Sequence, residues 1–161
     1  SLASVYGLML ENVSARKRIE SSFRIIDWVC FNLLIGNNDS HAKNLSFLMT
    51  NKLHDLSPFY DLISTAIYPS LSKGFSFKIG GAFAFEKMGQ KRVTLEEEQL
   101  GLKEGIFSER MSLVYKNILE TQDALITEID ENFPKAKIHK QIKELILKRA
   151  RFFIKTGLIV E

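Results

Sequence analysis

The sequence has 161 residues, of which 45% are hydrophobic and 25% are charged, an ordinary composition for one globular domain. These values exclude disordered and fibrous proteins, and no apolar run reaches the ~18–20 residues that a membrane span needs. The net charge is only +3, and residues 1–20 lack the pattern of a signal peptide. The single cysteine, Cys30, lies among apolar neighbours, as expected for a small core residue in a reducing cytoplasm.

A helix is predicted over residues 14–35, after an N-terminal stretch that also has a helical pattern. It becomes almost wholly apolar toward its end, so it is expected to lie at the centre of a core. The apolar side chains are Phe23, Ile25, Ile26, Trp28, Val29, Phe31, Leu33 and Leu34. Gly36 predicts the end of this helix, because glycine readily takes the left-handed conformation common there.

Two β-hairpins are predicted next. In the first, residues 45–49 and 53–57 alternate between apolar and polar or small side chains, and residues 50–52 have turn chemistry. In the second, residues 74–85 alternate strictly at first and then contain the pair Gly80–Gly81, which indicates a turn or a bulge.

The remaining sequence predicts helices. Thr94 and Glu97 have capping-box spacing, which predicts a helix start, and Ser108 is expected to open a second helix. Pro134 is expected in the first turn of a third helix that ends at Gly157. The predicted fold class is therefore α+β, mostly α-helical, with one or two small hairpins in a single compact unit.

Residues 135–155 carry eight basic side chains against one acidic side chain, Glu144. The basic residues are Lys135, Lys137, Lys140, Lys143, Lys148, Arg149, Arg151 and Lys155. This run fits either a solvated helix face or a surface that contacts nucleic acid, since charge alone rarely specifies a partner.

A polar cluster follows the apolar helix directly. Asp39 and Asn44 are five residues apart, and Asp61 comes after the first predicted hairpin. Because a hairpin returns the chain to its starting edge, Asp61 is expected to lie close to Asn44. An amide oxygen and a carboxylate are ligands that suit Mg²⁺, and Asp39 would be free to orient a hydroxyl nucleophile. Phosphoryl transfer uses this arrangement of a base and two metal ligands.

The segments GNNDSHAKNLSFL and LSPFYDLIST resemble the HipA family of bacterial toxin serine/threonine kinases. The family pattern N-x-D-x-H-x-K-N, followed by P-x-Y-D-L, is matched at Asn37, Asp39, His41, Lys43, Asn44, Pro58, Tyr60, Asp61 and Leu62. The later segment FSFKIGG also resembles a family segment, whereas the helices after residue 94 carry no distinctive motif.

The resemblance implies that Asp39 is the catalytic base and that Asn44 and Asp61 bind Mg²⁺, with ATP as the phosphoryl donor. His41 and Lys43 are candidates for contacts with the γ-phosphate or the substrate. Two simpler roles stay open, because Lys43 can pair with a carboxylate such as Asp39 and His41 can bond to the loop backbone.

Other polar residues have simpler predicted roles. Turn and cap chemistry is the alternative reading of the cluster itself, since Asn and Asp favour turns. Asn37 and Asn38 are expected to shape the loop rather than to bind ligands. His54 and His139 have no partner at metal-ligand spacing, so no site is assigned to them.

A kinase also needs a phosphate-binding loop and a lysine on its small lobe, and the sequence has no glycine-rich motif of that kind. Lys17 is predicted at the start of a helix rather than on a strand, so it is not assigned that role. The resemblance therefore implies that residues 1–161 form a C-terminal kinase lobe without its N-terminal ATP-binding lobe. The isolated chain is expected to be inactive.

The resemblance also implies partners. They are a protein substrate such as an aminoacyl-tRNA synthetase and a HipB-like antitoxin, in the bacterial cytoplasm and without membrane contact. Two alternatives stay open. Small-molecule kinases of the aminoglycoside or choline type use a similar loop, but they typically have H-G-D where this sequence has GNND. A non-catalytic module could instead dock an antitoxin or DNA through residues 135–155.

Overall fold

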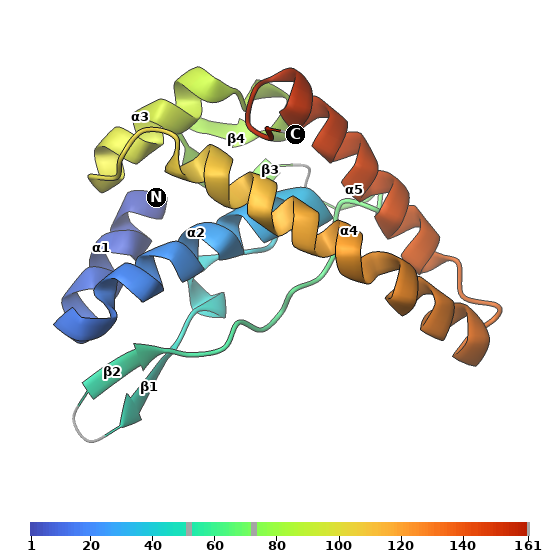
Figure 1. The fold of residues 1–161 in the computed structure, drawn as a ribbon, viewed down its shortest axis with the longest axis horizontal. Helices are drawn as coiled ribbons and strands as arrows, with labels where there is room; N and C mark the ends of the chain where they lie inside the picture. Colours follow the sequence, from blue (N-terminus) through green and yellow to red (C-terminus); the bar gives the residue numbers. More distant parts are fainter. Residues whose placement is uncertain (51–52, 72–73, 161) are drawn as a thin grey trace.

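The computed structural model describes residues 1–50, 53–71 and 74–160 and shows helices with two small hairpins (Figure 1). The helices are α1 (Leu2–Asn12), α2 (Arg18–Ile35), α3 (Gln90–Leu100), α4 (Ile106–Asn132) and α5 (Ile138–Lys155). The strands are β1 (Phe47–Thr50), β2 (Leu53–Leu56), β3 (Gly74–Ile79) and β4 (Ala82–Ala84), and short 3₁₀ turns cover Ala15–Lys17, Ala42–Asn44 and Phe85–Lys87. The predicted α+β, mostly helical class is confirmed. No helix in these residues is both long and apolar enough to cross a bilayer.

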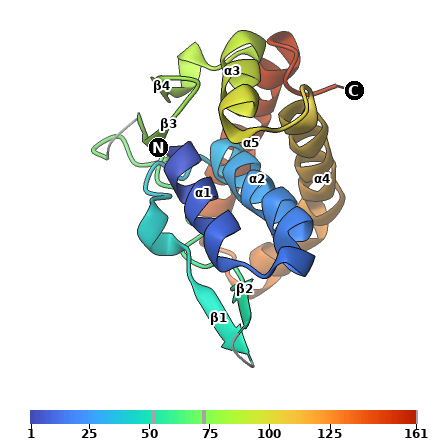
Figure 2. The ribbon, with the colours of Figure 1, turned by 90° about the vertical axis from the view of Figure 1, so that its left-hand side faces the viewer.

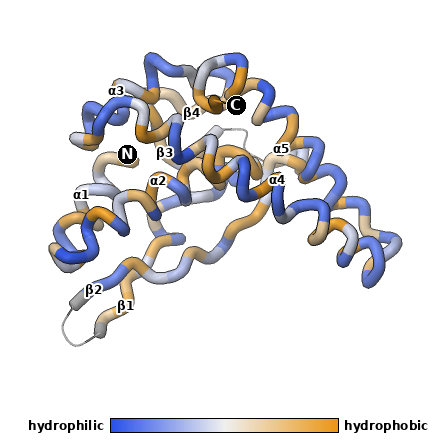
Figure 3. Tube along the Cα trace, viewed as in Figure 1, coloured by the Kyte–Doolittle hydropathy of each residue, from blue (hydrophilic) through white to orange (hydrophobic). Residues whose placement is uncertain are grey.

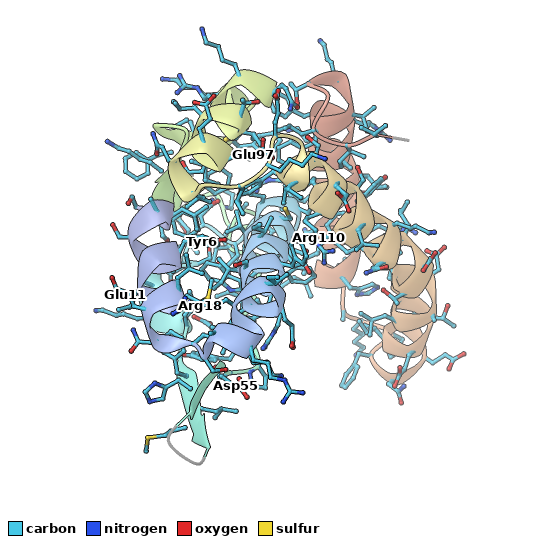
Figure 4. The ribbon with its side chains drawn as sticks, turned by 60° about the vertical axis from the view of Figure 1, so that its left-hand side comes forward. Tyr6, Glu11, Arg18, Asp55, Glu97 and Arg110 are labelled. Carbon is cyan, nitrogen blue, oxygen red and sulfur yellow. The ribbon has the colours of Figure 1, made fainter. Side chains whose placement is uncertain are left out.

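Helix α2 lies at the centre of the core, between α1 and α4 (Figure 2). Its fully buried side chains include Ile26 and Leu34, and each such side chain stabilises the fold by about 1.5–3 kcal/mol. Polar contacts fix the helices beside it (Figure 4). Tyr6 of α1 donates to Ser22 Oγ at 2.9 Å, and Arg110 of α4 donates through Nε to Asp27 at 2.7 Å.

Gly36 ends α2, as predicted, with φ +74°. A Cβ at this position would lie 2.7 Å from both Ala66 Cβ and a Leu145 methyl group. Glycine is therefore required both by the backbone conformation and by the close packing of two distant segments. This close packing brings the start of the following loop against α5.

The two hairpins match their predictions where the structure describes them. Strands β1 and β2 pair antiparallel with Phe47 opposite Leu56, while the predicted turn residues 51–52 lie outside the described residues. Figures 1 and 2 both show this hairpin extending away from the helices. In β3, alternate residues from Phe75 to Ile79 are buried, and Gly80 and Gly81 have positive φ in the turn to β4.

The predicted capping box is wrong. Thr94 lies inside α3 rather than before it. Glu97 accepts hydrogen bonds from the backbone N–H groups of Phe107 at 2.7 Å and Gly105 at 3.1 Å. The carboxylate therefore caps the free amides at the start of α4. This helix begins at Ile106 and not, as predicted, at Ser108. Figure 4 labels Glu97 beside the loop that joins the two helices.

Pro134 is also not where it was predicted. It lies in the turn between α4 and α5, outside the first turn of α5, which begins at Ile138. This turn is exposed and mostly hydrophilic, as Figure 3 shows at the far ends of the two helices. The predicted end of α5 is confirmed by Gly157, which has φ +76° just after the helix.

Candidate active site

The loop that follows α2 is polar but mostly buried. Asn37, Asn38 and Ser40 are 1%, 7% and 3% exposed. Buried polar groups need hydrogen-bond partners, so this loop is expected to be held by specific contacts. Asp39, in contrast, has a side chain that is 63% exposed.

Asn37 makes three of these contacts through its side-chain amide. Its Nδ2 donates to Asn32 Oδ1 at 2.8 Å and to the backbone oxygen of Asp61 at 2.9 Å. Its Oδ1 accepts from the backbone N–H of Asp39 at 3.1 Å. Asn32 in turn donates to the Trp28 carbonyl of α2 at 2.7 Å, so the network is anchored in the central helix.

Further contacts come from the segment after Asp61 and from β3. The backbone N–H of Asn38 donates to Thr65 Oγ1 at 2.8 Å, and the Ser76 hydroxyl donates to the Asn38 carbonyl at 2.7 Å. The Ser40 hydroxyl bonds back to the Asn37 carbonyl at 3.1 Å. Asn37 and Asn38 therefore shape the loop, as predicted.

The first hairpin does bring Asp61 to Asn44. Asn44 Nδ2 donates to Asp61 Oδ2 at 2.8 Å and to the Asp39 carbonyl at 3.2 Å. Tyr60 adds a bond from its hydroxyl to the Lys43 carbonyl at 2.9 Å. The predicted proximity is confirmed, and all three residues of the polar cluster meet in one place.

Asp61 has a strained backbone. Within the described ranges it is the one non-glycine residue with positive φ, at +56°. Such a conformation costs about 1–3 kcal/mol and persists only where neighbouring groups hold it. Asn37 is one such group, because it donates to the Asp61 carbonyl at 2.9 Å. Arg24 of α2 holds the chain that precedes Asp61 by donating to the carbonyls of Leu56 and Ser57 at 2.8 Å each.

His41, and not Lys43, is the partner of Asp39. His41 Nε2 lies 3.8 Å from Asp39 Oδ1, and its Nδ1 is buried without a hydrogen-bond partner in the described part of the chain. No ion pair among the described residues includes Lys43, which is exposed. The simpler role considered for Lys43, a salt bridge to Asp39, is therefore absent from this part of the structure.

The donor atoms at Asn44 and Asp61 fit a hard divalent cation. Both N–H groups of Asn44 are used, so its Oδ1 is oriented, and neither this oxygen nor Asp61 Oδ1 has a hydrogen-bond partner in the described ranges. Amide and carboxylate oxygens are the protein ligands that Mg²⁺ takes, with waters or phosphates completing its shell. The described residues hold no cluster of three or more His, Cys, Asp or Glu side chains that would compete for a metal.

One residue of the basic run, Arg149, contacts the end of α2 just before the loop. Arg149 is 5% exposed, donates to the Leu33 carbonyl near the end of α2, and lies 4.6 Å from the Phe85 ring centroid. Burial lowers the pKa of Arg149 to about 10, so the side chain remains charged at neutral pH. A cation at this end of α2 complements the helix dipole just before the loop.

The rest of the basic run is divided between ion pairs and free surface. Lys140 pairs with Asp130 at 3.3 Å and Lys143 pairs with Asp123 at 2.8 Å. The exposed basic residues without such a pair in the described structure are Lys135, Lys137, Lys148, Arg151 and Lys155. A nucleic-acid surface on α5, if present, would use these residues and not Arg149.

The residues without an assigned site have structural roles. His54 Nδ1 lies 3.2 Å from the Asn12 carbonyl, and buried His139 lies 3.0 Å from Asp130. Cys30 is buried, and burial raises the pKa of its thiol. Lys17 lies at the start of α2 beside Glu20, as predicted, and not on a strand.

Sequence reasoning missed the residues that support the loop. The contacts of Asn32 with the loop, of Arg24 with the chain before Asp61 and of Arg149 with the end of α2 were not expected. Asn32 did carry a signal, since it is a lone amide in the apolar end of α2 and an unpaired amide is costly there. Arg24 and Arg149 carried none, because a charged residue that bonds to a distant carbonyl looks like any surface charge.

Comparisons with known proteins converge on one family. A family model described as the HipA-like C-terminal domain matches residues 2–125. "Putative kinase Y4mE" of Sinorhizobium fredii is 39% identical over 89 residues, which cover 55% of the chain and 19% of that protein. "Serine/threonine-protein kinase toxin HipA" of Shewanella oneidensis is 27% identical over 103 residues, which cover 64% of the chain and 24% of that protein.

A solved structure shows the same fold. The chain superposes with a TM-score of 0.83 and 22% identity on a chain of the Shewanella oneidensis MR-1 toxin–antitoxin complex of HipA, HipB and operator DNA. The match covers 98% of the present chain and 36% of the solved chain. The sequence thus spans about a fifth to a quarter of the curated relatives and about a third of the solved one.

Proposed function

The chain belongs to the family of HipA-like C-terminal domains, and from this premise we propose that it forms the catalytic-loop lobe of a protein serine/threonine kinase. The proposed reaction is ATP-dependent and Mg²⁺-dependent phosphoryl transfer in a toxin–antitoxin system. The contact between Asn44 and Asp61, with Asp39 beside it, is the observation that carries this proposal. The relatives named as kinases support it at the level of the family.

In this proposal Asp39 is the catalytic base. Its carboxylate is open to solvent while its backbone is held by Asn37 and Asn44. A fixed, accessible carboxylate is suited to accept the proton of a substrate hydroxyl as the oxygen attacks phosphorus. His41 lies beside this carboxylate, with its Nε2 3.8 Å from Asp39 Oδ1.

Asn44 and Asp61 would hold the metal through their unpaired oxygens. When bound, Mg²⁺ neutralises charge on the phosphates of the nucleotide. The protein's own contribution is to orient the two oxygens, which the bonds from Asn44 to Asp39 and Asp61 accomplish. Lys43, exposed on the same loop, is proposed to contact the γ-phosphate or the substrate.

Partners are proposed from the family. We expect a protein substrate, of which an aminoacyl-tRNA synthetase is the family's example, and a HipB-like antitoxin in the bacterial cytoplasm. The ATP-binding lobe would be supplied outside residues 1–161. The solved relative is a complex with HipB and operator DNA, which supports an antitoxin and DNA as partners here. Lys148 and Arg151 are the exposed residues to reverse in a DNA-binding test, since Arg149 is buried.

The test is transfer of the labelled γ-phosphate of ATP by the complete protein that contains these residues. Asp39→Asn and Asp61→Asn should each lower the rate by about 10²–10⁴-fold, the usual effect of losing a general base, with comparable loss for a metal ligand. Asp55→Asn is the matched control, because Asp55 lies on strand β2 (Figure 4), outside the loop and the segment that carry Asp39 and Asp61. Full activity in either site variant would refute the assignment, as would phosphorylation of a small alcohol with no labelled protein.

A further inference from the structure

One buried amide touches the backbone of both proposed acidic residues. Asn37 Oδ1 accepts from the Asp39 N–H at 3.1 Å, and Asn37 Nδ2 donates to the Asp61 carbonyl at 2.9 Å. The two acidic residues are 22 positions apart in sequence. Neither acidic side chain is used in these contacts, so both remain available for chemistry.

The side chain that makes these contacts is held rigidly. Asn37 is 1% exposed, and the second hydrogen of its Nδ2 donates to Asn32 Oδ1 at 2.8 Å. Asn32 is 2% exposed and is itself tied to Trp28 in α2. Side-chain amide hydrogen bonds therefore connect the central helix continuously to the backbone of both acidic residues.

Each atom of the Asn37 amide has a defined role. An amide presents donors and an acceptor in one rigid plane, so it fixes the distance between the groups that it joins. The Asp61 backbone is in the left-handed region, at φ +56°, and needs neighbouring groups to keep it there. The bond from Asn37 to the Asp61 carbonyl acts on that strained residue directly.

We propose that Asn37, anchored by Asn32, is the positioning residue that sets Asp39 and Asp61 relative to each other. This inference rests on the proposed function, and it goes beyond it by assigning the geometry of the site to an amide that binds neither metal nor substrate. The second link between the two acidic residues, through Asn44, involves a proposed metal ligand. Asn37 is the link that uses no side chain of a proposed metal ligand.

The experiment compares Asn37→Ala with Asn132→Ala in the complete protein. Asn132 is an exposed residue at the end of α4, and its amide bonds to the Glu128 carbonyl and to no other group in the described part of the chain, so it matches the substitution without touching the site. For Asn37→Ala we expect kcat to fall roughly 10–100-fold, the usual cost of a small misplacement of reacting groups. KM for the protein substrate should be unchanged, and the Mg²⁺ concentration for half-maximal rate should rise.

A second readout does not depend on turnover. The Asp39 N–H should exchange with solvent faster in Asn37→Ala, because its acceptor is gone, while amides in the middle of α2 keep their protection. Asn32→Leu, which removes the anchor but leaves the Asn37 amide in place, should show the same changes to a smaller extent. Should Asn37→Ala fold too poorly to assay, Asn32→Leu carries the test.

The outcomes separate the two proposals. If Asp39→Asn keeps full activity, the proposed function fails, whatever Asn37→Ala does. If Asp39→Asn is inactive while folded Asn37→Ala retains wild-type kcat and Mg²⁺ dependence, the positioning role is overturned and the proposed function stands. A loss of stability without a change in kcat per folded molecule would likewise overturn the positioning role.

Discussion

The loop after α2 and the turn between β3 and β4 are each held to a helix by a deeply buried polar side chain, but the two side chains differ in chemistry. At the loop, Asn37 is neutral and serves as donor and acceptor together. At the turn, Glu96 of α3 accepts from the Gly80 N–H at 2.6 Å, and Arg92 donates to the Gly80 carbonyl at 2.7 Å.

The two side chains differ in whether they can be protonated, since the Asn37 amide does not titrate and the Glu96 carboxyl group does. Asn37 satisfies the groups around it at every pH, so the geometry of the proposed site does not depend on titration of its support. Glu96 is 2% exposed, its Oε1 has no partner in the described residues, and burial raises its pKa. The turn between β3 and β4 is therefore held by a group whose charge state changes with pH.

The largest effect on the free energy of unfolding is expected from Asn37→Asp. The new carboxylate has the shape of the amide but cannot donate to Asn32 Oδ1 or to the Asp61 carbonyl, and it adds a buried charge. Because an unpaired buried charge costs about 3–5 kcal/mol, the free energy of unfolding should fall by about that amount in urea titrations. Asn132→Asp, at an exposed helix end, should change it by no more than about 0.5 kcal/mol. Equal effects would show that Asn37 is not a special position.

A smaller loss of stability is expected from Gly80→Ala in the turn between β3 and β4. Gly80 has φ +51°, and a Cβ there would lie 2.0 Å from the Arg92 carbonyl oxygen, so the turn has to move away from α3. We expect a loss of about 1–3 kcal/mol in the free energy of unfolding. Gly7→Ala is the matched control, since a Cβ at Gly7 in α1 meets nothing within 4 Å. Gly7→Ala should raise the free energy of unfolding by about 0.5–1 kcal/mol, because alanine favours the helix more than glycine does. A harmless Gly80→Ala would mean that the turn is not held as closely as described.

The smallest effect is a dependence on pH at Glu96. Since the folded-state pKa of Glu96 is raised, the folded protein binds this proton more tightly than the unfolded chain does. The stability that the folded protein gains by binding this proton is therefore complete below the usual carboxyl pKa. It is lost as pH rises through the raised folded-state pKa of Glu96. Against Glu96→Gln, the wild type should gain stability as pH is lowered from neutral. Thermal unfolding at several pH values measures this, and parallel pH profiles for the two proteins would contradict it.

Local patterns were sufficient for part of this structure. The apolar end of α2, the glycine that terminates it and the alternation of the first hairpin were enough to predict that Asp61 returns to Asn44. The supports of the loop were not predictable, because they depend on residues distant in sequence. Glu97 has a capping-box pattern with Thr94, yet its carboxylate caps the following helix. Arg149 resembles its basic neighbours in sequence and differs from them only in being buried against Phe85.

Paramagnetic Mn²⁺ reports on the proposed metal ligands without any need for turnover. In the complete protein with ATP, Mn²⁺ in place of Mg²⁺ should broaden the NMR signal of the Asn44 side-chain amide, because that group lies beside the proposed cation. Asp61→Asn should restore the signal by removing the carboxylate ligand, whereas Asp55→Asn should leave it broadened. A sharp Asn44 signal with bound Mn²⁺, or broadening that survives Asp61→Asn unchanged, would contradict a metal site at Asn44 and Asp61.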